Sequence, residues 1–128
     1  MAAAAKPRAR ILHAEDQPIV AEAVEMVLEN EGFAVERAAD GREALDKITA
    51  QPGAFDLLLT DDDMPRLSGL DLVRELRALK FAGRIIVLSG VVNSEKERGY
   101  RQLGIRTILE KPFQVRDLIR AIKEELAA

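Results

Sequence analysis

The sequence contains no cysteine and no tryptophan, and only 4% of its 128 residues are aromatic. Without cysteine, neither disulfide bonds nor thiolate metal sites can form, which fits a reducing compartment. The longest apolar run after the N-terminal alanines, residues 85–88, is far shorter than the roughly 20 residues that a membrane-spanning helix needs. Lysine and arginine are scattered among acids in a chain of net charge −3, so no basic nucleic-acid-binding face is indicated.

The first ten residues lack the charged start and apolar core of a secretory signal. We therefore expect residues 1–8 to be a short disordered lead-in and residues 9–127 to form one cytoplasmic domain. The length suits a single domain with a full hydrophobic core. No segment resembles a recognition helix, so we expect no output domain and no direct contact with nucleic acid or membrane.

Apolar runs of strand length alternate five times with amphipathic segments of helical spacing. Repeated strand–helix units demand parallel strands and right-handed crossovers. Five units suit an open, doubly wound α/β sheet, because a closed eight-stranded barrel needs about 250 residues. The expected strands cover residues 11–14, 33–38, 56–60, 84–88 and 107–109, and the expected helices cover residues 18–31, 40–50, 69–79, 94–103 and 115–126.

Three consecutive acids, Asp61, Asp62 and Asp63, follow the third expected strand, and Pro65 and Gly69 come soon after. In open parallel sheets, ligands bind at the carboxyl ends of the strands. Like charges about 4 Å apart repel by roughly 4 kcal/mol at an effective dielectric constant of 20. The cluster therefore predicts a bound cation.

The other strands end in chemically useful residues at the same rim: Glu15 and Asp16, Ser89, and Lys111. Mg²⁺ prefers oxygen ligands and is typically held by one or two carboxylates plus a phosphate. A carboxylate can attack phosphorus, and a hydroxyl and an ammonium can neutralise the transferred group. The pattern predicts a magnesium-dependent phosphoryl site.

These motifs, in this order and at this spacing, resemble the receiver domain of two-component response regulators over about residues 8–127. The resemblance implies a flavodoxin-like, CheY-like fold of five strand–helix units with Mg²⁺ as cofactor. It also implies a phosphoryl group received from a histidine kinase or a histidine phosphotransfer protein. The motifs that carry it are Glu15-Asp16, Asp61 with Met64-Pro65 and Gly69, Ser89-Gly90, and Lys111-Pro112-Phe113.

The same resemblance implies a role for each site residue. Asp61 is the expected phospho-acceptor, and Asp16 and Asp61 are expected to bind Mg²⁺ directly. Glu15 is expected to act through a metal-bound water, and Asp63 through its backbone carbonyl. The two remaining site residues are expected to meet the phosphoryl group: Ser89 by hydrogen bonding its oxygens, and Lys111 by pairing with the carboxylate or phosphate. The Lys111-Pro112 bond resembles the family's cis peptide bond.

The sequence departs from the family pattern at three positions. Ile108 stands where most receivers carry Tyr or Phe three residues before the lysine, and its aliphatic side chain has no phenol to act as the usual aromatic switch. Glu15 replaces the first acid of a pair that is often Asp-Asp, and Gly90 stands where Ala or Thr is common. We expect output through the fourth helix, the fifth strand and the fifth helix.

Four further residues have a plain interpretation and a functional one. We expect Asp62 to be a solvated loop acid, whereas the side chain of Asp63 could face solvent or place a third negative charge beside the phosphoryl group. His13, the only histidine, lies inside the first strand, so we expect a packed, hydrogen-bonded structural residue and not a phosphohistidine or a metal ligand. Tyr100 is expected to be a partly buried packing residue of the fourth helix.

The functional hypothesis is a phosphorylation-controlled binding module, with no enzyme activity beyond its own phosphorylation and dephosphorylation. Its downstream protein partner is unknown, and we expect a monomer or weak dimer. One alternative is a receiver-like scaffold that binds partners without phosphorylation. The other is a small haloacid-dehalogenase-like phosphatase, which Asp61-x-Asp63 suggests but Pro65 disfavours, because those enzymes usually carry Thr or Val there.

Overall fold

The computed structural model describes residues 8–128, which form a five-stranded parallel sheet with five helices. The strands lie in the order β2-β1-β3-β4-β5, so the doubly wound, flavodoxin-like topology expected from the sequence is confirmed. Every boundary lies within one or two residues of its expected place. The elements are β1 (Arg10–Ala14), α1 (Pro18–Asn30), β2 (Ala34–Ala38), α2 (Gly41–Ala50), β3 (Leu57–Asp61), α3 (Gly69–Ala78), β4 (Arg84–Ser89), α4 (Ser94–Gln102), β5 (Thr107–Glu110) and α5 (Val115–Ala127).

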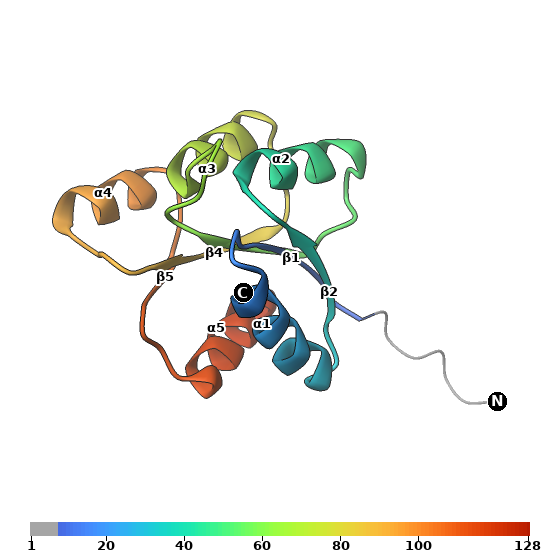
Figure 1. The fold of residues 1–128 in the computed structure, drawn as a ribbon. Helices are drawn as coiled ribbons and strands as arrows, with labels where there is room; N and C mark the ends of the chain where they lie inside the picture. Colours follow the sequence, from blue (N-terminus) through green and yellow to red (C-terminus); the bar gives the residue numbers. More distant parts are fainter. Residues whose placement is uncertain (1–7) are drawn as a thin grey trace.

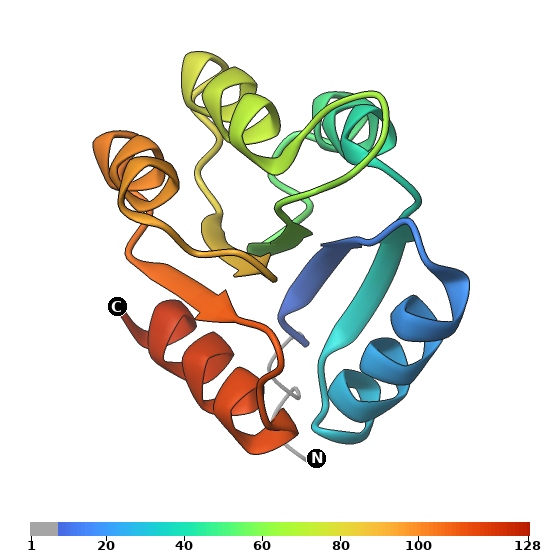
Figure 2. The same ribbon diagram turned by 60° about the vertical axis from the view of Figure 1, so that its left-hand side comes forward.

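The helices cover the sheet in two layers, with α2, α3 and α4 on one face and α1 and α5 on the other (Figure 1). Figure 2 shows the same two layers from a second direction. Each face has its own apolar core, because side chains alternate along a strand. In β3, Leu58 packs under α2 and α3, while Leu57 and Leu59 pack under α1 and α5.

Side-chain caps explain where three of the helices begin. Asp40 accepts a hydrogen bond from the Glu43 amide at 2.8 Å, and the Glu43 carboxylate accepts one from the amide of Ala39 at 3.2 Å. Ser68 caps α3 in the same way, and Asn93 caps α4. These bonds satisfy amides that the first helical turn leaves free.

One boundary matters for the site, because β3 includes Asp61 as its last residue. Asp61 pairs with Leu88 of β4, so the ladder holds the backbone of Asp61 and fixes the direction of its side chain. Alternation then places Asp61 on the face of α1 and α5, after Leu57 and Leu59, and turns Asp62 toward the opposite face. Two neighbouring acids thus enter different surroundings.

The expected disordered segment, residues 1–8, lies outside the described residues except for Arg8, which is exposed and belongs to no helix or strand. Within residues 8–128, no helix combines the length and apolarity needed to cross a membrane.

Candidate functional site

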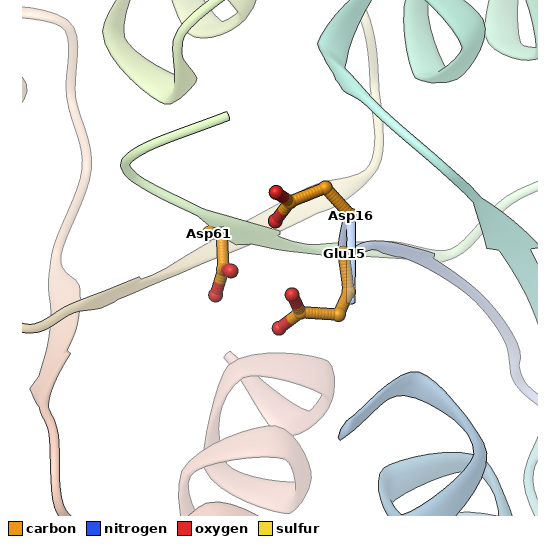
Figure 3. Close-up of side chains that lie close together, drawn as sticks. All are labelled: Glu15, Asp16 and Asp61. Carbon is orange, nitrogen blue, oxygen red and sulfur yellow. The ribbon is translucent and has the colours of Figure 1, made fainter. Parts of the chain in front are cut away.

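Three acids from two neighbouring strands meet at the carboxyl edge of the sheet. Glu15 and Asp16 follow β1, and Asp61 ends β3, the strand beside it. One carboxylate oxygen from each residue lies within 4.8 Å of the other two. Figure 3 shows the three side chains pointing into a shared space from the ends of these strands. The expected juxtaposition of these acids is therefore present.

Burial makes this cluster electrostatically costly. Glu15 is 2% exposed and Asp61 4% exposed. Burial, followed by the hydrogen bond and charge of the neighbouring Asp61 carboxyl, raises the pKa of Glu15 to about 7. The site thus holds more acid than its own cations neutralise, and a divalent cation with oxygen ligands suits this surplus.

Lys111 supplies the positive charge of the site. Its ammonium nitrogen lies 2.8 Å from Oδ1 of Asp61. The Lys111 amide donates to the carbonyl of Ser89 at 2.8 Å, which ties the loop after β5 to the end of β4. The Lys111-Pro112 peptide bond is cis, as the resemblance implied.

Ser89 is 1% exposed at the end of β4, where the sequence placed it. Its Oγ donates to the carbonyl of Val91 at 2.9 Å and lies 3.4 Å from Oδ2 of Asp62. The hydroxyl is therefore engaged on the Asp62 side of the strand, although it was expected to serve a group on Asp61.

The expectation for Asp62 is wrong: it is not a solvated loop acid. Only 10% of its side chain is exposed, and its carboxylate binds both the Tyr100 hydroxyl and the Lys96 ammonium. Tyr100 is a packing residue of α4, as expected, but it is fully buried rather than partly buried. Sequence reasoning missed this pair, although one signal was present: Tyr100 is the only aromatic residue of an otherwise polar helix.

The structure also shows the surroundings of Asp63 and His13. The Asp63 residue is exposed, while its backbone follows directly on the acid cluster. His13 is fully buried, as expected, but the expected hydrogen bond is wrong: neither ring nitrogen has a partner among the described residues. Burial, followed by the charges of Lys111 and Arg37, lowers the pKa of His13 to about 4, so the ring is neutral near pH 7.

Comparison with known proteins decides the family. Residues 11–123 match the model of the response regulator receiver domain. The chain belongs to this family. It is therefore a receiver domain of two-component signalling, a signalling module rather than a conventional enzyme.

Individual receiver proteins support the assignment. The chain is 36% identical over 121 residues to the transcriptional regulatory protein PdtaR of Mycobacterium tuberculosis, covering 94% of this chain and 57% of PdtaR. It is 35% identical over 126 residues to the alkaline phosphatase synthesis transcriptional regulatory protein SphR of Synechococcus elongatus, covering 91% of this chain and 48% of SphR. The chain thus spans about half the length of these curated relatives.

Solved receiver structures share the fold. A CheY-like receiver domain protein from Methanospirillum hungatei superposes with a TM-score of 0.87 at 30% identity, covering 94% of this chain and 95% of that chain. Against this background Ile108 remains a departure: it is partly buried and packs against the apolar cluster beneath α2, α3 and α4.

Proposed function

We propose that this receiver domain accepts a phosphoryl group on Asp61 from a histidine kinase or a histidine phosphotransfer protein, and that the modification changes its affinity for a partner protein. The proposal rests on the charged groups that surround the Asp61 carboxylate. A buried carboxylate with two further acids on one side and a lysine at 2.8 Å on the other has places for both a cation and an anionic phosphoryl group.

The residues present fit Mg²⁺, because the donor set consists of hard carboxylate oxygens gathered within 4.8 Å. Asp16 and Asp61 would hold the ion directly, Glu15 through a water, and Asp63 through its backbone carbonyl. Bound there, Mg²⁺ supplies charge neutralisation for the incoming phosphoryl oxygens.

Lys111, Asp61 and Ser89 each have a separate role in the phosphoryl transfer. Lys111 holds Oδ1 of Asp61, which leaves Oδ2 to attack phosphorus. An Oδ2–P bond forms as the P–N bond of the phosphohistidine breaks, and its electron pair leaves with the imidazole nitrogen. Lys111 then neutralises one phosphoryl oxygen, and the Ser89 hydroxyl donates to another.

Phosphorylation replaces a buried carboxylate by a more highly charged group with additional acceptor oxygens. Such a change biases a two-state equilibrium by the difference in its interactions with the two states. The surface of α4, β5 and α5 is the expected output face, because the loops after β4 and β5 lead from Ser89 and Lys111 into these elements.

The proposal is tested by intact mass after incubation with acetyl phosphate, with Mg²⁺ and with EDTA. We expect one added phosphoryl group that requires both Mg²⁺ and Asp61, so Asp61→Asn should remain unlabelled. Asp62→Asn is the matched comparison, because it removes the neighbouring acid without touching the cluster and should keep at least the wild-type labelling. Labelling of Asp61→Asn at the wild-type level would place the acceptor elsewhere.

The alternative, a scaffold that binds partners constitutively, draws on Ile108, whose packed aliphatic side chain has no hydroxyl to respond to phosphorylation. It predicts that a partner binds wild type and Asp61→Asn equally well, with or without phosphodonor. The main proposal predicts a difference between those conditions.

A further inference from the structure

Asp62 is surrounded by hydrogen-bond donors, unlike the clustered acids Glu15, Asp16 and Asp61 beside it. The Tyr100 hydroxyl donates to Oδ1, and the Lys96 ammonium pairs with Oδ2. The Ser89 hydroxyl lies 3.4 Å from the same Oδ2. These groups come from the end of β4 and from α4, so one carboxylate links the rim of the sheet to a helix.

The position of Tyr100 makes this link important for α4. Tyr100 is the only fully buried side chain of that helix, whose other described residues are polar, charged or glycine. The hydroxyl fits because residue 69 is glycine: a Cβ there would lie 2.8 Å from the Tyr100 oxygen and 2.5 Å from the carbonyl of Asp61. Tyr100 therefore anchors α4 at the Asp62 carboxylate.

The Ser89 hydroxyl has a single proton and two places to donate it. In this structure Ser89 donates that proton to the carbonyl of Val91 at 2.9 Å, with Oδ2 of Asp62 beside it at 3.4 Å, and no hydrogen bond joins Ser89 to Asp61 among the described residues. A phosphoryl group on Asp61 needs the same proton. The two arrangements of Ser89 are therefore mutually exclusive.

We propose that Asp62, held in place by Tyr100 and Lys96, is a latch that keeps Ser89 away from Asp61 until a phosphoryl group draws it off. This inference rests on the proposed phosphorylation of Asp61. Asp62 and Tyr100 are then positioning residues that act through Ser89. When Ser89 leaves, Asp62 loses the 3.4 Å contact with its hydroxyl and the anchor of α4 changes, so the response travels through Tyr100 and does not need a hydroxyl at position 108.

The latch has a reciprocal consequence. Contacts made only in the unphosphorylated state oppose phosphoryl binding, so breaking them must favour it by the same coupling factor. Tyr100→Phe removes the hydroxyl and keeps the ring, charge and packing. Asp62→Asn removes the charge and one acceptor oxygen. Both variants should therefore bind a phosphoryl mimic more tightly, whereas general damage to the fold would weaken binding.

The experiment measures binding of beryllium fluoride, a noncovalent phosphoryl mimic, in the presence of Mg²⁺ by calorimetry. We expect Tyr100→Phe and Asp62→Asn to lower the Kd about fivefold or more, the lower end of typical coupling factors. Glu95→Gln is the control: Glu95 is an exposed acid in the first turn of α4, beside Lys96, and should bind like wild type.

Tyr100 also provides a direct signal, because it is the only tyrosine in a chain without tryptophan. A hydrogen bond to a carboxylate quenches tyrosine emission. Emission should change when beryllium fluoride is added to wild type or Glu95→Gln, because Asp62 then loses its contact with Ser89 while Tyr100 still reports on its carboxylate. It should start higher and change little in Asp62→Asn.

Phosphorylation by acetyl phosphate, followed by intact mass in every variant, separates the two proposals. If Asp61 is labelled but Tyr100→Phe binds beryllium fluoride equally or more weakly, the latch is overturned and the phospho-acceptor role stands. If neither label nor mimic binds any variant, the phospho-acceptor role is overturned and the latch with it.

Discussion

Asp61 and Asp62 are adjacent in the chain and each pairs with a lysine, yet their surroundings are opposite in character. Asp61 lies beside Lys111 but shares its space with the carboxylates of Glu15 and Asp16. Asp62 lies beside Lys96 and accepts a hydrogen bond from the Tyr100 hydroxyl, with the Ser89 hydroxyl at 3.4 Å. Strand alternation sends the two side chains to different faces and so creates the contrast.

The difference shows how neighbouring residues at one sheet edge can take separate roles, Asp61 in a reactive cluster and Asp62 in structural contacts. A buried charge is costly unless it is paired and hydrogen-bonded. The acids around Asp61 carry more negative charge than Lys111 compensates, and the raised pKa of Glu15 reflects this. The cluster can therefore bind a cation. Asp62 is saturated with donors, which suits a residue that holds other groups in place.

The sharpest test of the contrast is phosphoryl labelling of two isosteric variants. Asp61→Asn should lose labelling completely, because an amide is not a nucleophile toward phosphorus. Asp62→Asn should be labelled at least to the wild-type extent, because Asp62 does not accept the phosphoryl group and its loss releases Ser89. The measurement is intact mass at saturating acetyl phosphate. Equal loss in both variants would mean that the two acids form one site.

The second test compares stabilisation by Mg²⁺. A ligand at 100 times its Kd raises the free energy of unfolding by about 2.7 kcal/mol. We expect a gain of this order for wild type and Asp62→Asn in urea denaturation, and little gain for Asp61→Asn. A sodium salt at equal ionic strength controls for charge screening. A full gain in Asp61→Asn would place the cation outside the acid cluster.

The third test measures folding stability without divalent cation. Tyr100→Phe should lower the free energy of unfolding by about 1.5–3 kcal/mol, the range for losing a hydrogen bond to a charged group. Asp61→Asn should be neutral or stabilising, since it relieves repulsion from Glu15 and Asp16. Urea denaturation in EDTA gives both values. Destabilisation of the same size in both variants would remove the distinction between the two acids.

The sequence predicted the fold and the Asp61 cluster because both depend on spacing. Apolar periodicity sets the elements, and a parallel sheet brings the strand ends to one edge. Glu15, Asp16, Asp61, Ser89 and Lys111 all lie at the strand ends to which spacing assigned them. The binding roles given to these residues, and to the Asp63 carbonyl, stay predictions.

The Asp62–Tyr100 contact could not be predicted in the same way. It joins residues 38 positions apart and depends on how α4 is rotated and on the space left by Gly69. No periodicity encodes either quantity, so a solvated acid was the simplest expectation for a turn. The hydrogen bond expected for His13 failed for a related reason, since burial of a strand residue does not guarantee a partner.

The mildest test follows the ionisation of Tyr100. Burial, followed by the hydrogen bond and charge of Asp62, raises the pKa of Tyr100 well above its usual value of about 10. Because the folded state holds this proton more tightly than the unfolded state, the stabilisation is complete below pH 10 and is lost as the pH rises beyond it.

Absorbance of the phenolate in an alkaline titration reports Tyr100 alone, since the chain has no other tyrosine. We expect ionisation of wild type only at the pH where circular dichroism shows unfolding, and ionisation of folded Asp62→Asn at a lower pH, because the amide no longer repels the phenolate. Asp61→Asn should titrate like wild type, since its carboxylate faces the other side of the strand. A titration midpoint near 10 in folded wild type would show that Tyr100 does not donate to Asp62, and the contrast between the two aspartates would then rest on the acids around Asp61 alone.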